Sequence, residues 1–175
     1  MTAQAGRRSP DRQRTTTTKG TPKSCHERAL GLLAVRPRSR RELELRLLGA
    51  GFPEAEVAEV LGRLEAVGLV DDRAFARSLA EHAFGNRRAG ERSVRSALSG
   101  KGVAPEAVAA AIEEFGGDEE TRALELARSR AGRLGSLPPE RAYARLVGLL
   151  ARRGYPHAVA RQAAGQALRV DAPDD

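Results

Sequence analysis

The 175-residue sequence predicts an all-α protein: an elongated tandem array of three three-helix repeats, preceded by a disordered basic N-terminal tail. Three observations support this fold class. Apolar residues recur at the three- and four-residue spacing of amphipathic helices, and no segment shows the sustained alternation of a β-strand. A leucine–glycine pattern occurs three times at nearly equal spacing. Helix-start signals precede the apolar segments.

Residues 1–23 are predicted to form the disordered basic tail. They hold six basic side chains against Asp11 alone, so they carry most of the chain's formal charge of +7. The segment has almost no large apolar side chains and therefore cannot bury enough surface to offset the entropy of ordering. Such a tail is either dispensable or a weak electrostatic attractor of nucleic acid.

A Leu-x-x-x-Gly-apolar pattern marks the end of the second helix in each predicted repeat. It occurs at 47–52, 98–103 and 150–155, so its glycines are 51 and 52 residues apart. A glycine just past a helix adopts the left-handed conformation easily, and the apolar residue after it packs back onto the leucine, as in a Schellman stop. Each occurrence therefore predicts a helix that ends against its own leucine.

The repeat spacing divides the chain into predicted segments with three helices each. The first repeat is 24–68, the second 69–116 and the third 117–170, followed by an acidic C-terminal end at 171–175. The predicted helices are 25–35, 40–50 and 53–67, then 72–84, 91–101 and 105–115, then 119–134, 139–153 and 156–168. Because each repeat makes only a small core, neighbouring repeats are expected to pack end to end.

Local start signals agree with these helices. Ser39 and Glu42 form a capping box, and Asp71 and Asp118 are expected to be N-caps. Prolines at 53, 105 and 139 suit the first turn of a helix.

The second helix of each repeat is predicted to be basic. The net charge is +3 over 36–46, +4 over 85–101 and +3 over 140–153, whereas it is −3 over both 53–67 and 105–116. An array with its second helices on one side would carry a basic stripe suited to a phosphate backbone or an acidic protein groove. The alternative interpretation is an ordinary solvated surface with intrahelical ion pairs.

No catalytic, cofactor or metal site is predicted. The three histidines lie in different repeats, and Cys25-His26 has no further ligand at zinc spacing. Cys25 is interpreted as a small buried helix residue, and Asp71-Asp72 as a helix start instead of an acid–base or metal pair. The glycine clusters lack the strand-to-helix setting and the Lys-Ser/Thr of a phosphate loop. We therefore expect a non-enzyme without cofactors.

The composition also predicts the compartment. No apolar run approaches the roughly 18 residues that a membrane span needs. Met1 to Lys23 lack the apolar stretch of a secretory signal, and a single cysteine fits a reducing environment. The expected location is the cytoplasm, with no membrane contact.

Four motifs in order resemble those of the RecX family. Residues 68–77, Gly-Leu-Val-Asp-Asp-Arg-Ala-Phe-Ala-Arg, resemble its Gly-apolar-apolar-Asp-Asp-x-x-aromatic-Ala motif. Residues 90–108 are similar to its Gly-x-x-x-Ile, Leu-x-x-Lys-Gly-Ile and Ile run, and 39–43 to its first-unit helix start. Residues 152–155, Arg-Arg-Gly-Tyr, resemble its third-unit Arg-Arg-Gly-Phe. The resemblance covers 25–168 and departs at Tyr155-Pro156, where the family usually has Phe-Ser.

The resemblance implies a monomeric negative regulator that binds RecA recombinase and its filament on single-stranded DNA. Such proteins are thought to lie in the filament groove or to cap its growing end, suppressing ATPase, strand exchange and co-protease activity, and hence to act in recombination and the SOS response. The expected partner contacts are the arginines of the basic second helices, namely Arg40, Arg41, Arg46, Arg87, Arg88, Arg92, Arg95, Arg152 and Arg153. Weak direct contact with nucleic acid is a further expectation.

Two other function classes stay open at this point. A three-helix unit can place one helix in a DNA groove, so a helical DNA-binding regulator acting without RecA is the main alternative. A helical scaffold for another protein partner is the second.

Overall fold

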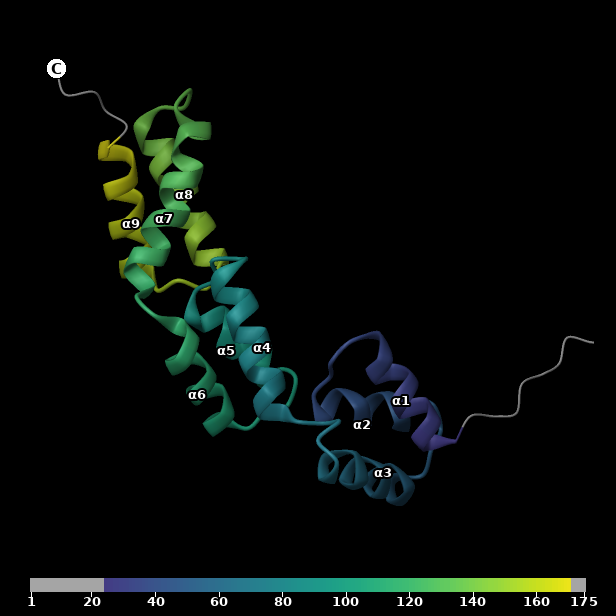
Figure 1. Ribbon diagram of the computed structural model, residues 1–175. Helices are drawn as coiled ribbons and strands as arrows, with labels where there is room; N and C mark the ends of the chain where they lie inside the picture. The colour runs from purple at the N-terminus through teal and green to yellow at the C-terminus, as the bar shows by residue number, and fades with distance from the viewer. Residues whose placement is uncertain (1–23, 171–175) are drawn as a thin grey trace, which may run out of the picture.

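The computed structural model describes residues 24–170, which contain nine α-helices, one short 3-10 helix and no strand. The helices fall into three groups of three, which follow one another along an extended, bent path (Figure 1). The predicted all-α tandem array of three-helix repeats is therefore confirmed. The predicted disordered tail at 1–23 and acidic end at 171–175 lie outside the described residues.

We call the three groups units 1, 2 and 3. Unit 1 contains α1 (Cys25–Val35), α2 (Arg40–Leu48) and α3 (Glu54–Ala66). Unit 2 contains α4 (Asp72–Gly85), α5 (Glu91–Ser99) and α6 (Pro105–Gly116). Unit 3 contains α7 (Glu119–Ala131), the 3-10 helix η1 (Gly132–Leu134), α8 (Pro139–Arg152) and α9 (His157–Val170). Each helix matches a predicted one, with differences confined to the ends.

The helix starts follow the sequence signals. Ser39 and Glu42 form the expected capping box at α2. Asp71 accepts backbone N–H bonds at the start of α4, and Asp118 accepts one at the start of α7. The expectation for Pro53 was wrong by one position: it precedes α3 as the N-cap with an extended backbone, because the helix begins at the following glutamate.

The predicted Schellman stops are present in all three units. Gly51, Gly102 and Gly154 have positive φ angles of 91°, 74° and 91°. The residue after each glycine donates its N–H to the carbonyl of the pattern's leucine at 3.2 or 3.3 Å: Phe52 to Leu47, Val103 to Leu98 and Tyr155 to Leu150. These leucines are fully buried, so each helix stop is fixed into the core of its own unit.

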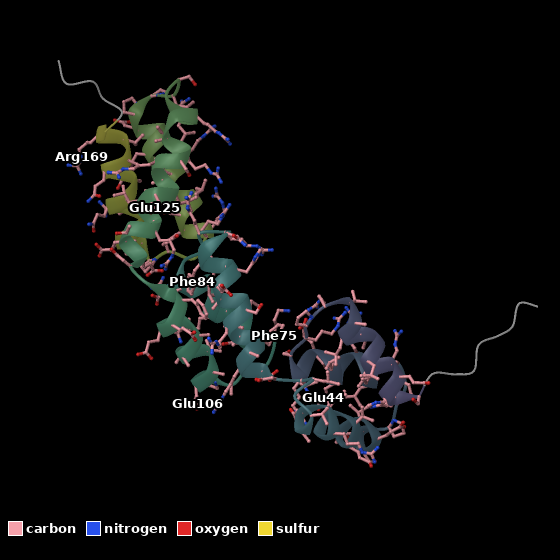
Figure 2. The ribbon with its side chains drawn as sticks, viewed as in Figure 1. Glu44, Phe75, Phe84, Glu106, Glu125 and Arg169 are labelled. Atoms are coloured by element: carbon pink, nitrogen blue, oxygen red, sulfur yellow. The ribbon has the colours of Figure 1, made fainter. Side chains whose placement is uncertain are left out.

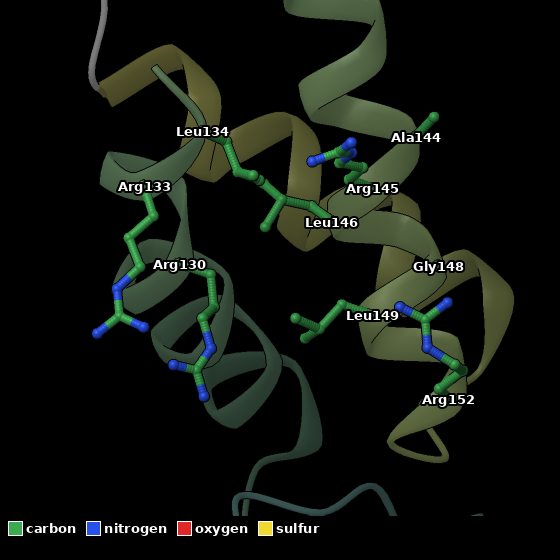
Figure 3. A pocket seen from close by; sticks show the side chains of 9 residues that line it. All are labelled: Arg130, Arg133, Leu134, Ala144, Arg145, Leu146, Gly148, Leu149 and Arg152. Atoms are coloured by element: carbon green, nitrogen blue, oxygen red, sulfur yellow. The ribbon is translucent and has the colours of Figure 1, made fainter. Parts of the chain in front are cut away.

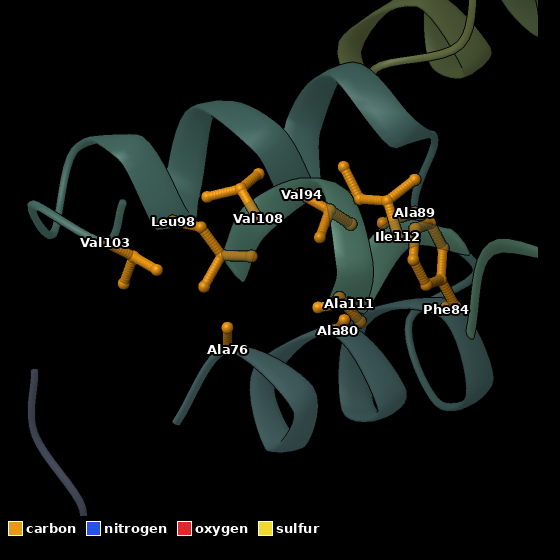
Figure 4. Packing of buried hydrophobic residues seen from close by; sticks show 11 residues of the cluster. Ala76, Ala80, Phe84, Ala89, Val94, Leu98, Val103, Val108, Ala111 and Ile112 are labelled. Atoms are coloured by element: carbon orange, nitrogen blue, oxygen red, sulfur yellow. The ribbon is translucent and has the colours of Figure 1, made fainter. Parts of the chain in front are cut away.

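Each unit has its own hydrophobic core. Unit 1 packs Leu43, Leu47, Leu61 and Leu64 together, and unit 2 packs Phe84 and Ile112 with smaller residues (Figure 4). In unit 3, α9 contributes small side chains to the core, namely Ala160, Ala163, Ala164 and Ala167. Alanines allow two helix backbones to approach closely, so the Ala-rich last helix packs firmly on α7 and α8.

Candidate interaction surface along the second helices

Units 1 and 2 meet where the start of α2 rests on the end of α5. The buried Ser39 donates its hydroxyl to the carbonyl oxygen of Lys101 at 2.7 Å. The N–H of Arg40, the first residue of α2, donates to Oδ1 of Asp72, the first residue of α4, at 2.8 Å. One of the free N–H groups at the start of α2 is therefore satisfied by the next unit.

A partly buried ion pair and a close backbone approach reinforce this junction. Nζ of Lys101 donates to Oε1 of Glu42 at 2.8 Å and lies 5.8 Å from the centre of the Phe75 ring. A Cβ atom placed on Gly102 would lie 2.6 Å from Cβ of Arg41, so the glycine lets the two units approach. Burial alone raises the pKa of Glu42, but hydrogen bonds from Arg36, from Lys101 and from the Ser39 backbone lower it to about 2.

Units 2 and 3 meet in the same way, with the start of α5 on the end of α8. The N–H of Gly90 donates to the carbonyl oxygen of Arg153 at 2.8 Å. The N–H of Glu91 donates to Oε1 of Glu119 at 2.8 Å. Both helix-starting pairs, Arg40 with Asp72 and Glu91 with Glu119, join the first residue of a second helix to the first residue of the next unit.

Side chains of unit 3 also hold the strained segment before α5. Arg88 is the one residue other than glycine with a positive φ angle in the described range, at 46°. Its carbonyl oxygen accepts the hydroxyl of Tyr155 at 2.7 Å, and the neighbouring carbonyl of Arg87 accepts Nη1 of Arg153 at 2.6 Å. The guanidinium of Arg122 lies 4.6 Å from the centre of the Phe84 ring, which adds a cation–π contact.

The two junctions place the second helices end to end. The carboxyl end of α8 contacts the amino end of α5, and the carboxyl end of α5 contacts the amino end of α2. The carboxyl end of each second helix therefore lies against the amino end of the next one, in the order α8, α5, α2. The segments that are basic in sequence thus follow one another along the array.

The structure brings some of the predicted contact arginines together. Arg92 and Arg152 line one hollow of about 560 Å³ across the junction of α5 and α8. Arg87, Arg88 and Arg153 meet at the same junction. At the other junction, Arg40 and Arg41 lie at the start of α2, whereas Arg46 and Arg95 stand further along their own helices.

Ion pairing and exposure separate eight of these nine arginines into two sets, while the ninth, Arg153, is partly buried and donates to the Arg87 carbonyl. Among residues 24–170, five have exposed side chains with no carboxylate within ion-pair distance, namely Arg46, Arg87, Arg92, Arg95 and Arg152. Three are paired: Arg40 with Glu65 at 2.9 Å, Arg41 with Glu44 at 2.6 Å and Arg88 with Glu125 at 3.6 Å. Exposed ion pairs of this kind contribute little to stability, so these three arginines can also leave their carboxylates to bind a partner.

Three further arginines were not among the contact residues predicted from the sequence. Arg130, Arg133 and Arg145 line a second hollow together with Arg152, between the end of α7 and α8 (Figure 3). Their spacing places Arg130 and Arg133 on one helix face, but sequence alone does not pair that face with α8. Figure 2 shows the side chains of the described residues along the array.

Within the described residues, no group of three or more His, Cys, Asp or Glu side chains is arranged to hold a metal ion. Cys25 is fully buried, and burial raises the pKa of its thiol. Over the same part of the chain, every helix is too short or too polar to cross a lipid bilayer.

At both junctions the start of one second helix contacts the end of another, and the basic second helices follow one another. This arrangement defines a tandem helical-repeat protein. Three family models match the chain: "RecX, first three-helix domain" at 25–64, "RecX, second three-helix domain" at 71–112 and "RecX, third three-helix domain" at 118–164. The chain belongs to the RecX family of regulatory proteins.

Relatives and solved structures agree with this assignment. Regulatory protein RecX of Amycolatopsis mediterranei is 36% identical over 84% of this chain and 85% of the relative. That of Mycolicibacterium smegmatis is 40% identical over 75% of this chain and 72% of the relative. The crystal structure of RecX from Lactobacillus salivarius matches the fold with a TM-score of 0.69 and 19% identity, covering 83% of this chain and 95% of the other.

The motif residues that carry the family resemblance lie mainly at the junctions. Asp71 caps α4, Asp72 accepts the first N–H of α2, and Phe75 lies beside Lys101. Gly154 and Tyr155 contact the start of α5. These residues hold units together, so part of each motif describes how the array is assembled.

Proposed function

We propose that the protein is a negative regulator of RecA that binds RecA and its filament on single-stranded DNA. The binding surface is the series of basic second helices α2, α5 and α8. Bound there, the chain suppresses ATP hydrolysis, strand exchange and co-protease activity. It acts as a cytoplasmic monomer, without a cofactor and without catalysis of its own.

The end-to-end order of the second helices is the observation that supports this proposal most strongly. A filament offers the same site once per subunit, and the array offers a comparable helix once per unit. Several weak contacts on one rigid array raise the effective concentration of each further contact, so they add up to useful affinity. The exposed arginines Arg46, Arg92 and Arg152, one in each unit, supply such contacts.

Features of the surface favour a protein partner over nucleic acid alone. Strong binders of single-stranded nucleic acid stack bases on exposed aromatic rings. Each of the six aromatic side chains of this chain is buried or partly buried, so none offers an open stacking platform. The third helices α3 and α6 are acidic, which limits attraction to a polyanion.

The direct test is RecA ATP hydrolysis on single-stranded DNA, with this protein added from substoichiometric to equimolar amounts. We expect hydrolysis to fall over this range. Unchanged hydrolysis throughout the range would contradict the proposal.

A charge-reversal pair tests the binding surface. Arg92→Glu with Arg95→Glu reverses two unpaired charges on α5 and should remove most of the inhibition. The matched control is Arg28→Glu with Arg128→Glu, which makes the same charge change at two exposed arginines of α1 and α7 that have no ion-pair partner among residues 24–170. Full inhibition by the α5 variant would refute this surface while leaving the regulatory function in place.

The alternative, a helical DNA-binding regulator acting without RecA, is favoured by one observation. Arg92 and Arg152 line a shared hollow and have no ion-pair partner among residues 24–170. This alternative requires tight duplex binding with a steep salt dependence, measured by fluorescence anisotropy. Our proposal allows weak contact with nucleic acid but no tight binding in the absence of RecA.

A further inference from the structure

Unit 3 contains a groove between the end of α7 with η1 and the middle of α8. The groove has a volume of about 550 Å³. Arg130 and Arg133 form one wall, Arg145 and Arg152 form the other, and Leu149 points into the space between them (Figure 3). We call this site the arginine groove.

Four positive charges in the arginine groove lack negative partners. None of its arginines has a carboxylate within ion-pair distance among residues 24–170, although acid-paired arginines are common elsewhere on the surface. Arg133, Arg145 and Arg152 are exposed, and Arg130 is partly buried. Like charges held together repel one another, so an anion in the groove would be stabilised.

The floor of the groove is apolar and open. Leu134 and Leu149 are partly exposed, and the buried Leu146 lies beneath them. Gly148 stands in the middle of α8, where glycine costs a helix roughly 0.5–1 kcal/mol relative to alanine. A Cβ atom there would lie 3.3 Å from Nη1 of Arg152, so the glycine leaves room for that guanidinium to lie beside it along α8 (Figure 3).

We propose that the arginine groove binds an acidic amphipathic segment of a partner protein. Arg145 and Arg152 are seven residues apart on α8, which places them about 10.5 Å apart along the helix axis. Carboxylates seven residues, or about two turns, apart on a bound helix would meet them. Arginine binds carboxylates in a two-pronged geometry, which would favour this match. Apolar side chains between those carboxylates would rest on Leu134 and Leu149, as in other helix-in-groove complexes.

The lining favours a peptide over nucleic acid. Leucines supply the floor, and no aromatic side chain that could stack on a base lines the groove.

The residues that line the groove in unit 3 are not repeated in unit 2. Aligning the units on their stop glycines places Ser93, Ala97 and Gly100 of unit 2 at the positions of Arg145, Leu149 and Arg152. The longer α8 of unit 3, with 14 residues against 9 in α5, reaches the end of α7.

A synthetic peptide tests this inference without RecA. The probe is a fluorescein-labelled helix of about five turns, with leucines on one face and glutamates beside them. The comparison peptide replaces the leucines with serine at the same charge, and a single-stranded thymidine oligonucleotide serves as a nucleic-acid probe. With the full chain, fluorescence anisotropy should show the leucine peptide binding roughly tenfold or more tighter than the serine peptide or the oligonucleotide.

Matched variants locate the binding. Arg130→Ala with Arg145→Ala should weaken peptide binding roughly tenfold or more, because each wall loses a charge-assisted hydrogen bond. Arg28→Ala with Arg63→Ala, the control on unit 1, should leave it unchanged. Gly148→Leu keeps every charge but fills the groove, and it should weaken binding too. Circular dichroism checks that each variant keeps its helix content.

Three outcomes would overturn the inference. Equal binding of the serine peptide or the oligonucleotide would mean a general polyanion site. Unchanged binding by the groove variants would place the peptide elsewhere. A variant ending at Val170 that binds the peptide roughly tenfold tighter would identify residues 171–175 of this chain as the occupant. A chain that binds the peptide but leaves RecA hydrolysis unchanged would contradict only the proposed function.

Discussion

Alanine substitution at two helix-stop glycines can distinguish two contributions to the free energy of unfolding. One is the strain of a left-handed alanine at the helix stop, and the other is a clash at the junction between units. Gly51 and Gly154 both have a φ angle of 91°. A Cβ atom on Gly51 would meet nothing within 4 Å, whereas one on Gly154 would lie 2.5 Å from both the backbone N and Cβ of Ser93. Replacing each by alanine therefore introduces the same local strain but only one clash between units.

The expected magnitudes follow from these surroundings. A left-handed alanine costs roughly 1–2 kcal/mol, so Gly51→Ala should lower the free energy of unfolding by about that amount. Gly154→Ala carries the same cost plus overpacking against Ser93, which is worth about 1–3 kcal/mol. The second variant should therefore be destabilised by about 2–5 kcal/mol in total.

Urea unfolding followed by circular dichroism measures both variants, and hydrogen exchange locates the effect. The N–H groups of Gly90 and Glu91 donate across the junction of units 2 and 3. Their protection should fall in Gly154→Ala and stay as in the parent chain in Gly51→Ala. Equal destabilisation of the two variants, with unchanged exchange at Gly90, would refute the junction geometry.

Three further predictions concern single side chains. The pKa of Glu42 lies at about 2 against an ordinary 4.5, so its contribution to stability, up to about 3 kcal/mol, is complete above about pH 4.5 and is lost as the pH falls toward 2. The thermal unfolding midpoint of Glu42→Gln should therefore lie below that of the parent chain at pH 7, and the two midpoints should converge near pH 2. Tyr155→Phe removes the hydrogen bond to the Arg88 carbonyl and should cost about 1 kcal/mol in urea unfolding; no change would mean that water replaces the hydroxyl. Cys25, fully buried with a raised thiol pKa, should react with a thiol reagent only as fast as the chain unfolds, and rapid labelling of the native chain would contradict its burial.

Features that depend on neighbouring residues in the chain could be predicted from the sequence. A Schellman stop needs a leucine, a glycine and an apolar residue within six positions, and all three occurrences fold as expected. The capping box of Ser39 with Glu42 is equally local. These signals determine where helices begin and end, and their equal spacing reveals the repeat.

Features that join distant parts of the chain could not be predicted in this way. Gly90 meets Gly154 across the junction of units 2 and 3, and nothing near either glycine indicates the other. The same holds for ion pairing, because Arg40 pairs with Glu65 on a different helix. The arginine groove was missed because helix spacing identifies a face but does not say which helix lies opposite.

Co-sedimentation with RecA filaments on single-stranded DNA tests the central claim most directly. The parent chain should pellet with the filaments, and Arg92→Glu with Arg95→Glu should leave most of the chain in the supernatant. A parent chain that stays in the supernatant while the filaments pellet would contradict the claim that the basic second helices bind RecA.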